Sequence, residues 1–189
     1  MIKISMNKNI LVYIAGFRGD KSIRPALDGV YFSADGAIVA SNGHRLGKVV
    51  DAWGVATADS EMMPADGVVL GMDKTDIAAL RKAKDDIIMI DIDMPGRKAT
   101  IMTDTLSFIV PLIDSPYPDL ERVIPTSIQG GGRGPQTVCL SPTELVGFAG
   151  YSKKEFLRLS FTTDNPTAPV VVYNTALPSF VGVIAPCRL

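Results

Sequence analysis

Leu140-Ser141-Pro142-Thr143-Glu144-Leu145-Val146 carries a specific signal for the start of a helix. Ser141 is an N-cap residue, Pro142 occupies the first helical position and Glu144 follows three residues after the cap, as in a capping box. Two other stretches have the same order of apolar residue, N-cap residue and helical run, Met6-Asn7-Lys8-Asn9-Ile10-Leu11-Val12 and Met72-Asp73-Lys74-Thr75-Asp76-Ile77-Ala78. The three N-cap positions are spaced by 66 and 68 residues, which indicates an internal repeat.

Each repeat, called here unit one, two or three, has a predicted strand before its helix and three strands after it. The predicted strands are 2–5, 29–32, 37–40 and 46–50 in unit one; 68–71, 87–92, 98–102 and 106–112 in unit two; and 137–140, 156–161, 169–173 and 180–185 in unit three. The fold class is therefore α+β, with three β-α-β-β-β units. Because one unit cannot bury both its helix and its sheet face, we expect units one and two to pack helix beside helix on a shared antiparallel sheet.

Two breaks in composition divide the chain, one at residues 51–64 and one at residues 128–135. The second contains Gly130-Gly131-Gly132-Arg133-Gly134, which is typical of a flexible linker. We predict a domain at 1–127 built from units one and two, a Gly-rich linker at 128–135 and a single half-domain at 136–189. Such a half-domain leaves a sheet edge and an apolar face without a partner, which favours pairing with another chain.

The composition excludes several classes of protein. The 189 residues are 47% hydrophobic and 21% charged, which is enough apolar residue for a core, and the net charge of -1 excludes a generally basic surface but not a basic patch. The two cysteines, Cys139 and Cys187, are too few for a disulfide framework or a zinc site and are expected to be free thiols. With no long apolar run and no signal-peptide pattern, we expect a cytoplasmic protein without membrane contact.

Catalytic and metal-binding patterns are missing from the sequence, so we expect no enzyme activity, no cofactor and no metal. His44 is the only histidine, and a hydrolase using Ser41 with His44 is the one nucleophile–base pair that the sequence offers. No G-x-S-x-G motif supports that pair. Asp91 and Asp93 share one strand face, which is expected to be solvated. Residues 130–134 lack the G-K-[ST] ending of a phosphate loop.

Basic residues concentrate on the predicted helices, a distribution suited to the phosphates of duplex DNA without sequence readout. The alternative is an ordinary solvated helix face. The predicted DNA-binding residues are Lys8, Arg18, Lys21, Lys74, Arg81, Lys82, Lys84, Lys153 and Lys154.

Four stretches carry a family resemblance. Residues 24–30 (RPALDGV) are similar to an R-x-x-L-x-G segment, and residues 39–46 (VASNGHRL) to an A-T-D-G-H-R-L signature. Residues 117–125 (YPDLERVIP) are similar to F-P-D-Y-x-R-V-[IL]-P, and residues 183–189 (VIAPCRL) to V-M-P-M-R-L. All four belong, in this order, to the bacterial DNA polymerase III beta subunit, the sliding clamp, which the chain resembles over nearly its whole length.

The resemblance implies the DNA-clamp fold, in which paired β-α-β-β-β units place helices inside a ring and sheets outside. Residues 1–127 resemble the middle domain of a clamp, and residues 136–189 resemble the second half of its last domain. The first domain and half of the last have no counterpart. This departure puts the standard ring of two three-domain chains in doubt.

The family's partner site is a hydrophobic pocket between the middle and last domains, which receives short linear peptides from polymerases, the clamp loader and repair proteins. The resemblance carries this peptide-binding pocket to Arg24, Leu27, Ser41, Gly43, His44, Arg45, Leu46, Pro118, Arg122, Val123, Val183, Ala185, Pro186, Cys187, Arg188 and Leu189. Ser41 and Asn42 depart from the family's Thr and Asp, Ala185 and Cys187 replace two methionines, and Glu144 stands where clamps often carry Tyr.

The sequence thus predicts a non-enzymatic processivity factor that assembles with copies of itself around duplex DNA and tethers a polymerase. Clamp rings contain twelve such units, so four chains of three units make a numerically possible ring. A smaller, open assembly in which third units pair across a two-fold axis is also possible. The second hypothesis is a reduced clamp-like protein that binds peptides, and regulates or decoys clamp partners, without encircling DNA. The third is the Ser41–His44 hydrolase.

Overall fold

The computed structural model describes every residue of the chain except 121, 126–137, 162–166 and 188–189. Unit one contains β1 (Ile2–Asn7), α1 (Lys8–Ala15), the 3-10 helix η1 (Pro25–Asp28), β2 (Val30–Phe32), β3 (Ile38–Ser41) and β4 (Arg45–Val49), followed by β5 (Trp53–Val55). Unit two contains β6 (Val68–Leu70), α2 (Lys74–Lys82), β7 (Ile87–Asp93), β8 (Lys98–Met102) and β9 (Ser107–Pro111). Unit three contains α3 (Pro142–Val146), β10 (Leu157–Phe161), β11 (Val170–Asn174) and β12 (Leu177–Ile184).

All three helices begin at the predicted N-cap residues. The side chains of Asn7, Asp73 and Ser141 each accept a hydrogen bond from a backbone N–H of the first turn. At Asp73 the capping box is complete, because the Asp76 carboxylate accepts from the Asp73 N–H at 2.8 Å. The capping box expected at Ser141 is only half formed. The Glu144 carboxylate is instead paired with groups of unit one.

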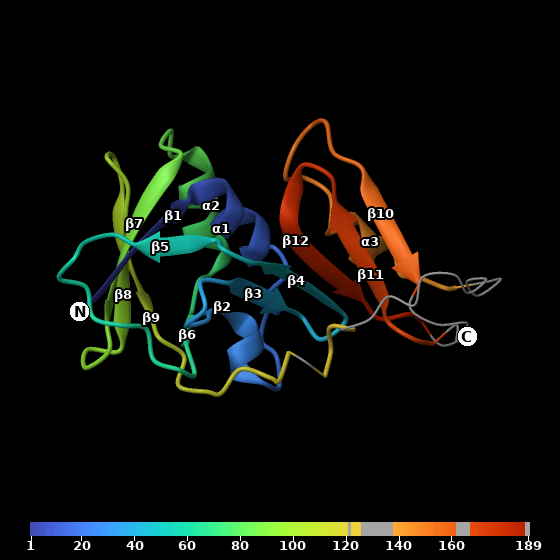
Figure 1. Cartoon of the computed structure of the whole chain (residues 1–189), viewed down its shortest axis with the longest axis horizontal. Helices are drawn as coiled ribbons and strands as arrows, with labels where there is room; N and C mark the ends of the chain where they lie inside the picture. Colours follow the sequence, from blue (N-terminus) through green and yellow to red (C-terminus); the bar gives the residue numbers. More distant parts are fainter. Residues whose placement is uncertain (121, 126–137, 162–166, 188–189) are drawn as a thin grey trace.

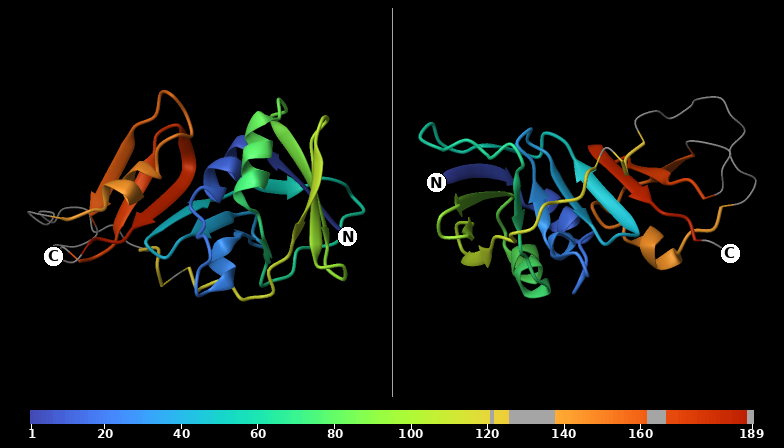
Figure 2. Two further views of the ribbon diagram at one scale, coloured as in Figure 1. Left: turned by 180° about the vertical axis from the view of Figure 1, so that it is seen from behind. Right: turned by 90° about the horizontal axis from the view of Figure 1, so that it is seen from below.

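Two sheets form instead of the single sheet expected for units one and two. One has the order β5-β1-β7-β8-β9 and the other the order β10-β11-β12-β4-β3-β2-β6. Each unit gives its first strand to the other: β1 pairs with β7, and β6 pairs with β2. This exchange places α1 and α2 side by side on one side of the two sheets (Figure 1; Figure 2, left).

Unit three extends the sheet of unit one. β12 pairs with β4 along five residues, from Phe180 opposite Val49 to Ile184 opposite Arg45. One edge of unit three is therefore satisfied within the chain, and β10 ends the sheet (Figure 1). The predicted linker and the boundaries at 127 and 136 lie outside the described residues, so the two-domain division stays a prediction.

Two strand predictions differ from the structure. Residues 138–140, expected as the first strand of unit three, are not in a strand, and residue 137 lies outside the described part. Residues Trp53–Val55 form β5, which pairs with the outer edge of β1 in a stretch expected to be a break. Both differences concern pairing partners, which local sequence patterns do not show.

Buried aromatic rings join unit three to α1. Tyr13 lies edge-on to Phe17, Tyr151 and Phe180, with ring centroids 5.2–5.4 Å apart, and Phe17 lies 5.1 Å from Phe148. The Tyr13 hydroxyl donates to the Phe148 carbonyl at 2.7 Å. Together with the β4–β12 pairing, this cluster holds unit three firmly against unit one.

Candidate peptide-binding and DNA-facing sites

The turn between β3 and β4 is built from the second resemblance motif, and its polar groups are used locally. Ser41 Oγ donates to the Arg45 carbonyl at 2.8 Å and accepts from the Gly43 N–H at 3.1 Å, while Asn42 Oδ1 accepts from the N–H groups of His44 and Arg45. Gly43 has φ +90°, a conformation that favours glycine. The Ser41 proton is thus engaged with a backbone carbonyl rather than with His44, which gives the hydrolase hypothesis no support.

Arg45 points away from the predicted pocket, toward α1 and α3. Its Nη1 lies 3.3 Å from Glu144 Oε2, its Nη2 donates to the Gly16 carbonyl at 2.9 Å, and its guanidinium lies 5.5 Å from the centroid of the Phe17 ring. A Cβ at Gly147 would lie 2.0 Å from Arg45 Nη1, so a larger residue there would push the guanidinium out of this position. Arg45 therefore joins unit one to unit three, a role that the resemblance did not indicate.

Leu46 and Val183 form the centre of the predicted pocket. They lie opposite each other on β4 and β12, are each 3% exposed and form a small apolar cluster with Val39. Tyr31, Tyr117, Leu120 and Ile124 pack over this cluster. The structure thus brings these two of the predicted pocket residues together, and Tyr117, Leu120 and Ile124 cover them.

The remaining predicted pocket residues lie on several other segments of the chain. Arg24 and Leu27 belong to the region of η1, which contacts β2 and β3. Arg122 is exposed and pairs with Asp119 at 3.1 Å, and Val123 is 40% exposed. Ala185 donates its N–H to the carbonyl of exposed His44 at 2.9 Å, and Pro186 and Cys187 follow it beyond β12. Arg188 and Leu189 lie outside the described residues.

A cavity of about 700 Å³ lies beside the cluster, between the segment 112–120, the start of β6 and the β7–β8 turn. Pro118, Tyr31 and Tyr117 line it, and the exposed pair Arg97–Asp114, 2.6 Å apart, stands at its rim. The Tyr117 hydroxyl is buried and has no hydrogen-bond partner among the described residues, and burial raises the pKa of this phenol. Sequence reasoning missed this cavity because it depends on how the chain returns along the sheet after β9.

Three of the predicted DNA-binding residues surround a concavity of about 250 Å³ between α2 and the loop that follows α1. Arg18, Lys74 and Arg81 line it together with Asp20. Lys74 Nζ lies 2.6 Å from the Asp20 carboxylate, and this hydrogen bond lowers the pKa of Asp20. Part of the positive charge on this surface is therefore balanced within the chain.

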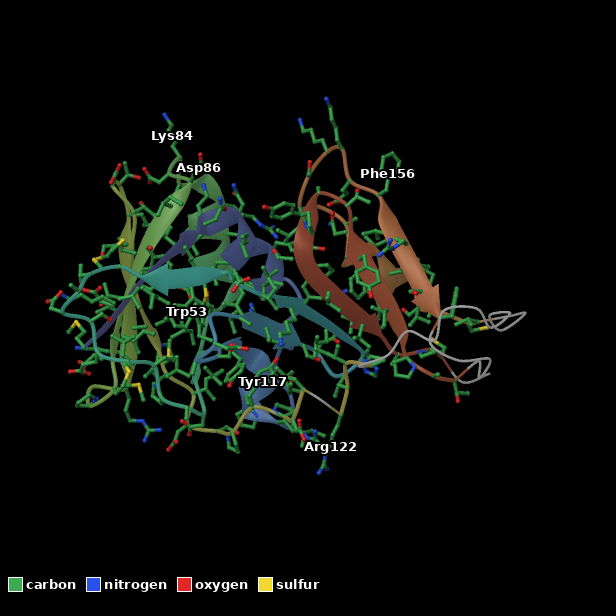
Figure 3. All side chains as sticks on the ribbon, in the orientation of Figure 1. Trp53, Lys84, Asp86, Tyr117, Arg122 and Phe156 are labelled. Carbon is green, nitrogen blue, oxygen red and sulfur yellow. The ribbon has the colours of Figure 1, made fainter. Side chains whose placement is uncertain are left out.

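The other predicted DNA-binding residues, with one exception, are exposed. Lys82 and Lys84 follow Arg81 at the end of α2, and Lys84 projects away from the body of the protein (Figure 3). Lys21 lies in the loop after α1, and Lys153 and Lys154 lie between α3 and β10. A cation in the last turn of a helix also interacts favourably with the helix dipole, so the positions of Arg81 and Lys82 are stabilising without DNA.

Lys8 is the exception, and its prediction needs correction. The residue is 6% exposed, and its ammonium donates a hydrogen bond to the Ala83 carbonyl at the end of α2. Its backbone N–H also donates to the Asp86 carbonyl at 2.8 Å. Lys8 thus ties α1 to the end of α2 inside the protein, where a DNA phosphate has no access.

Neither a metal centre nor a membrane-spanning helix is found in the described part of the chain. No three His, Cys, Asp or Glu side chains among those residues are grouped to hold a metal ion. None of the described helices has the length and hydropathy to cross a membrane. Cys139 and Cys187 are both free.

The comparisons with known proteins concern the fold. No protein-family model matches the sequence, and no curated protein is significantly similar to it. Among solved structures, the chain is similar to the DNA polymerase III beta subunit of Thermotoga maritima, with a TM-score of 0.71 and 15% identity, covering 100% of this chain and 66% of that one. It is similar to the Caulobacter crescentus beta sliding clamp, with a TM-score of 0.71 and 16% identity, covering 99% of this chain and 65% of that one. It is also similar to the DNA polymerase III subunit beta of Pseudomonas aeruginosa, with a TM-score of 0.70 and 17% identity, covering 100% of this chain and 67% of that one.

These similarities confirm the predicted α+β clamp architecture. The matched structures are longer, since this chain spans about two thirds of their length. The chain has the fold of the DNA polymerase III beta subunit, the sliding clamp, along its whole length.

Proposed function

We propose that this protein is a non-enzymatic, clamp-like processivity factor that self-assembles around duplex DNA in the cytoplasm and tethers a DNA polymerase. The observation that carries the proposal is the side-by-side packing of α1 and α2, with Arg18, Lys74 and Arg81 around one concavity. Helices on one side of continuous sheets present a basic surface that suits a phosphate backbone. The structurally similar proteins are subunits of a DNA polymerase.

DNA contact in this proposal is electrostatic and independent of sequence. Arg81, Lys82 and Lys84 form an exposed run at the end of α2 and contact phosphates first. Lys74 joins them only by exchanging its Asp20 partner for a phosphate. Since Lys74 is paired with Asp20 and Lys8 is buried, binding by one chain is weak and encirclement supplies the retention on DNA.

Ring formation requires several copies of the chain. Three units per chain and twelve units per clamp ring give four chains, and the chain spans 66% of the Thermotoga maritima subunit. β9 ends the five-stranded sheet and β10 ends the seven-stranded sheet, so both ends of one chain offer strand edges. Edges of this kind pair readily with other chains.

Tethering takes place at the Leu46–Val183 cluster. Short apolar peptides of a polymerase, of other clamp-binding proteins or of a clamp loader insert between β4 and the side chains of Leu120 and Ile124. Because Leu120 and Ile124 cover the cluster, the peptide displaces them to reach Leu46 and Val183. The cost of this displacement reduces the affinity for peptide.

The second candidate is a reduced clamp-like protein that binds and decoys clamp partners without encircling DNA. It is favoured by the small basic surface, in which Lys8 is buried and Lys74 is paired with Asp20. This candidate keeps the peptide site and needs no ring.

A topological assay separates the two candidates. The protein is incubated with nicked circular plasmid and with the same plasmid linearised, then each mixture is separated by gel filtration. Retention on circles that is lost on linear DNA supports the clamp. Pull-down by a clamp-binding peptide without retention on circles supports the decoy. The double variant R81A/K82A removes two positive charges from α2. It is compared with K98A, which removes an exposed positive charge from β8 of the five-stranded sheet.

A further inference from the structure

Residues 138–140 occupy the position of a first strand without being in one. In unit two the Ile113 N–H donates to the Val69 carbonyl of β6 at 2.9 Å, and in unit three the Cys187 N–H donates to the Cys139 carbonyl at 2.7 Å. Cys139 therefore stands in unit three where Val69 stands in unit two. The two segments differ in their second neighbour. β6 also pairs with β2, whereas no described strand lies beside residues 138–140.

The side chains around Cys139 already alternate as in a strand. Val138 and Leu140 pack against the main core, as Val68 and Leu70 of β6 do, and Cys139 is outside that core. A strand with one face on a core and unpaired backbone on one side is a template for another strand. Residues 138–140 are thus ready to pair and lack only the neighbour.

β10 lacks the complementary strand. β7 is the corresponding strand of unit two, and its outer neighbour is β1, the first strand of unit one. Within the described residues β10 has β11 on one side and nothing on the other. The consequence is visible in its burial, because Leu157 and Leu159 are half-buried whereas Ile88 and Ile90 of β7 are fully buried.

The helix beside this edge is also uncovered. α1 and α2 contact each other, whereas α3 has no buried residue and its Val146 is 70% exposed. Phe156, directly before β10, is 77% exposed, and Phe161 at its end is 38% exposed (Figure 3 shows Phe156). An apolar surface of this kind beside an open edge marks an interaction site.

We propose that unit three pairs with unit three of a second copy, with residues 138–140 of each chain adding as a strand to the open edge of β10 in the other. The occupant is a second copy because donor and acceptor stand on the same unit, so one two-fold axis satisfies both. Units one and two make the same exchange within the chain through β1 and β6. An unrelated strand would cover β10 but leave residues 138–140 unpaired.

The internal repeat also gives the register of this pairing. In unit one the Ala56 N–H donates to the Lys3 carbonyl at 2.9 Å, as Ile113 donates to Val69 and Cys187 to Cys139, and Lys3 is opposite Asp91 of β7. In unit two, Ile109 lies four residues before Ile113, and the sheet register aligns it with Thr100 and Asp91. In unit three, Val183 lies four residues before Cys187, and the sheet register aligns it with Val171 and Ser160. Cys139 therefore lies opposite Ser160 of the second copy.

Disulfide crosslinking tests the pairing. In a Cys187→Ala background, which leaves Cys139 as the one thiol, Ser160→Cys or Arg158→Cys places a second thiol on the outward side of β10. Directly opposed strand residues meet the Cα separation of about 4.4–6.8 Å that a disulfide needs. Ser160 is opposite Cys139 in the register derived above, and Arg158 is opposite Cys139 if the register shifts by two residues. Mild oxidation is then expected to convert most of the chain to a covalent dimer on a non-reducing gel.

Thr175→Cys is the matched control, since Thr175 is exposed in the turn between β11 and β12. The control and the Cys139-only chain are expected to stay monomeric on the gel. Circular dichroism of each reduced variant shows whether the fold is kept.

The inference rests on the self-assembly part of the proposed function, and the results distinguish the two. Dimer through Ser160→Cys or Arg158→Cys, but not through Thr175→Cys, supports the interface. If neither β10 variant forms a dimer, the proposed interface is overturned. Light scattering of the native chain then shows whether the chain assembles through another surface or does not assemble. Crosslinking that is equally strong in Thr175→Cys reflects random collision and also overturns the interface.

Discussion

Arg45 and Glu144 form an ion pair across the junction between unit one and unit three. Arg45 Nη1 lies 3.3 Å from Glu144 Oε2, and the two side chains are 15% and 20% exposed. Asn42 Nδ2 donates to the same carboxylate oxygen at 3.0 Å. The pair holds the β3–β4 turn against α3, so the geometry beside the candidate peptide site depends on both residues.

Removing the charge of Glu144 is expected to destabilise the fold. Glu144→Gln leaves Arg45 mostly buried without its counter-charge, and we expect the free energy of unfolding to fall by about 1–3 kcal/mol in urea denaturation. Arg97→Gln is the control, since its pair with Asp114 is 58% and 79% exposed and is worth less than about 1 kcal/mol. Equal losses in the two variants would contradict a structural role for the Arg45–Glu144 pair.

Alkaline pH is expected to weaken the attachment of unit three through Tyr13. Burial raises the pKa of Tyr13 from 10.0 to about 12, so the folded state favours the protonated phenol. The stabilisation is complete below a pH of about 10 and is lost as the pH rises toward 12, about 2–3 kcal/mol in total.

Tyr13→Phe tests this titration. The variant loses the hydrogen bond to the Phe148 carbonyl, about 1 kcal/mol at neutral pH, and loses less stability than the native chain at alkaline pH. Burial raises the pKa of Tyr117 as well, so part of the alkaline loss remains. Parallel stability profiles for the two chains above pH about 10 would show that Tyr13 does not titrate as described.

Alanine variants of Lys8 and Lys82 are expected to show separate effects, one on the free energy of unfolding and the other on DNA affinity. Lys8→Ala removes the buried ammonium from the Ala83 carbonyl and lowers the free energy of unfolding by about 1–3 kcal/mol, with DNA affinity unchanged. Lys82→Ala changes stability little and weakens DNA binding, because Lys82 is exposed. Fluorescence anisotropy with a labelled duplex measures the affinity, and a loss for Lys8→Ala in a folded protein would contradict its placement.

Salt dependence is expected to report the phosphate contacts of α2. For R81A/K82A we expect the slope of log K against log salt to fall by about 2, because each lost contact removes about 0.9. K98A is expected to keep the native slope. The proposed DNA-facing surface is wrong if K98A changes the slope as much as the double variant does.

Peptide affinity is expected to respond to the residues that cover the apolar cluster. Leu120→Ala removes part of the cover and should tighten the binding of a clamp-binding peptide, since less packing is displaced. Leu46→Ala removes part of the anchor surface and should weaken it. Isothermal titration with folded variants measures both, and weaker binding for Leu120→Ala would mean that Leu120 contacts the peptide instead of blocking it.

The sequence predicted the helices and most strands because their signals are local. N-caps at Asn7, Asp73 and Ser141 and alternating apolar residues indicate elements directly. The exchange of β1 and β6, the strand β5 and the absence of a strand at residues 138–140 depend on which partner is present, and no local pattern encodes it.

The candidate sites were predicted in part for the same reason. The resemblance indicated Leu46 and Val183, which do meet across β4 and β12. It did not show that Leu120 covers them, that Arg45 turns toward Glu144 or that Lys8 is buried under the end of α2. Each of these depends on contacts between residues far apart in the chain.

The number of chains in the native assembly tests the central claim most directly, because a ring built from this chain needs several copies. Light scattering coupled to gel filtration, over a range of protein concentrations, measures it without a polymerase or a loader. We expect a discrete assembly of four chains, which dissociates through a dimer on dilution. A strict monomer at the highest concentration would contradict ring formation and leave the peptide-binding decoy as the better account.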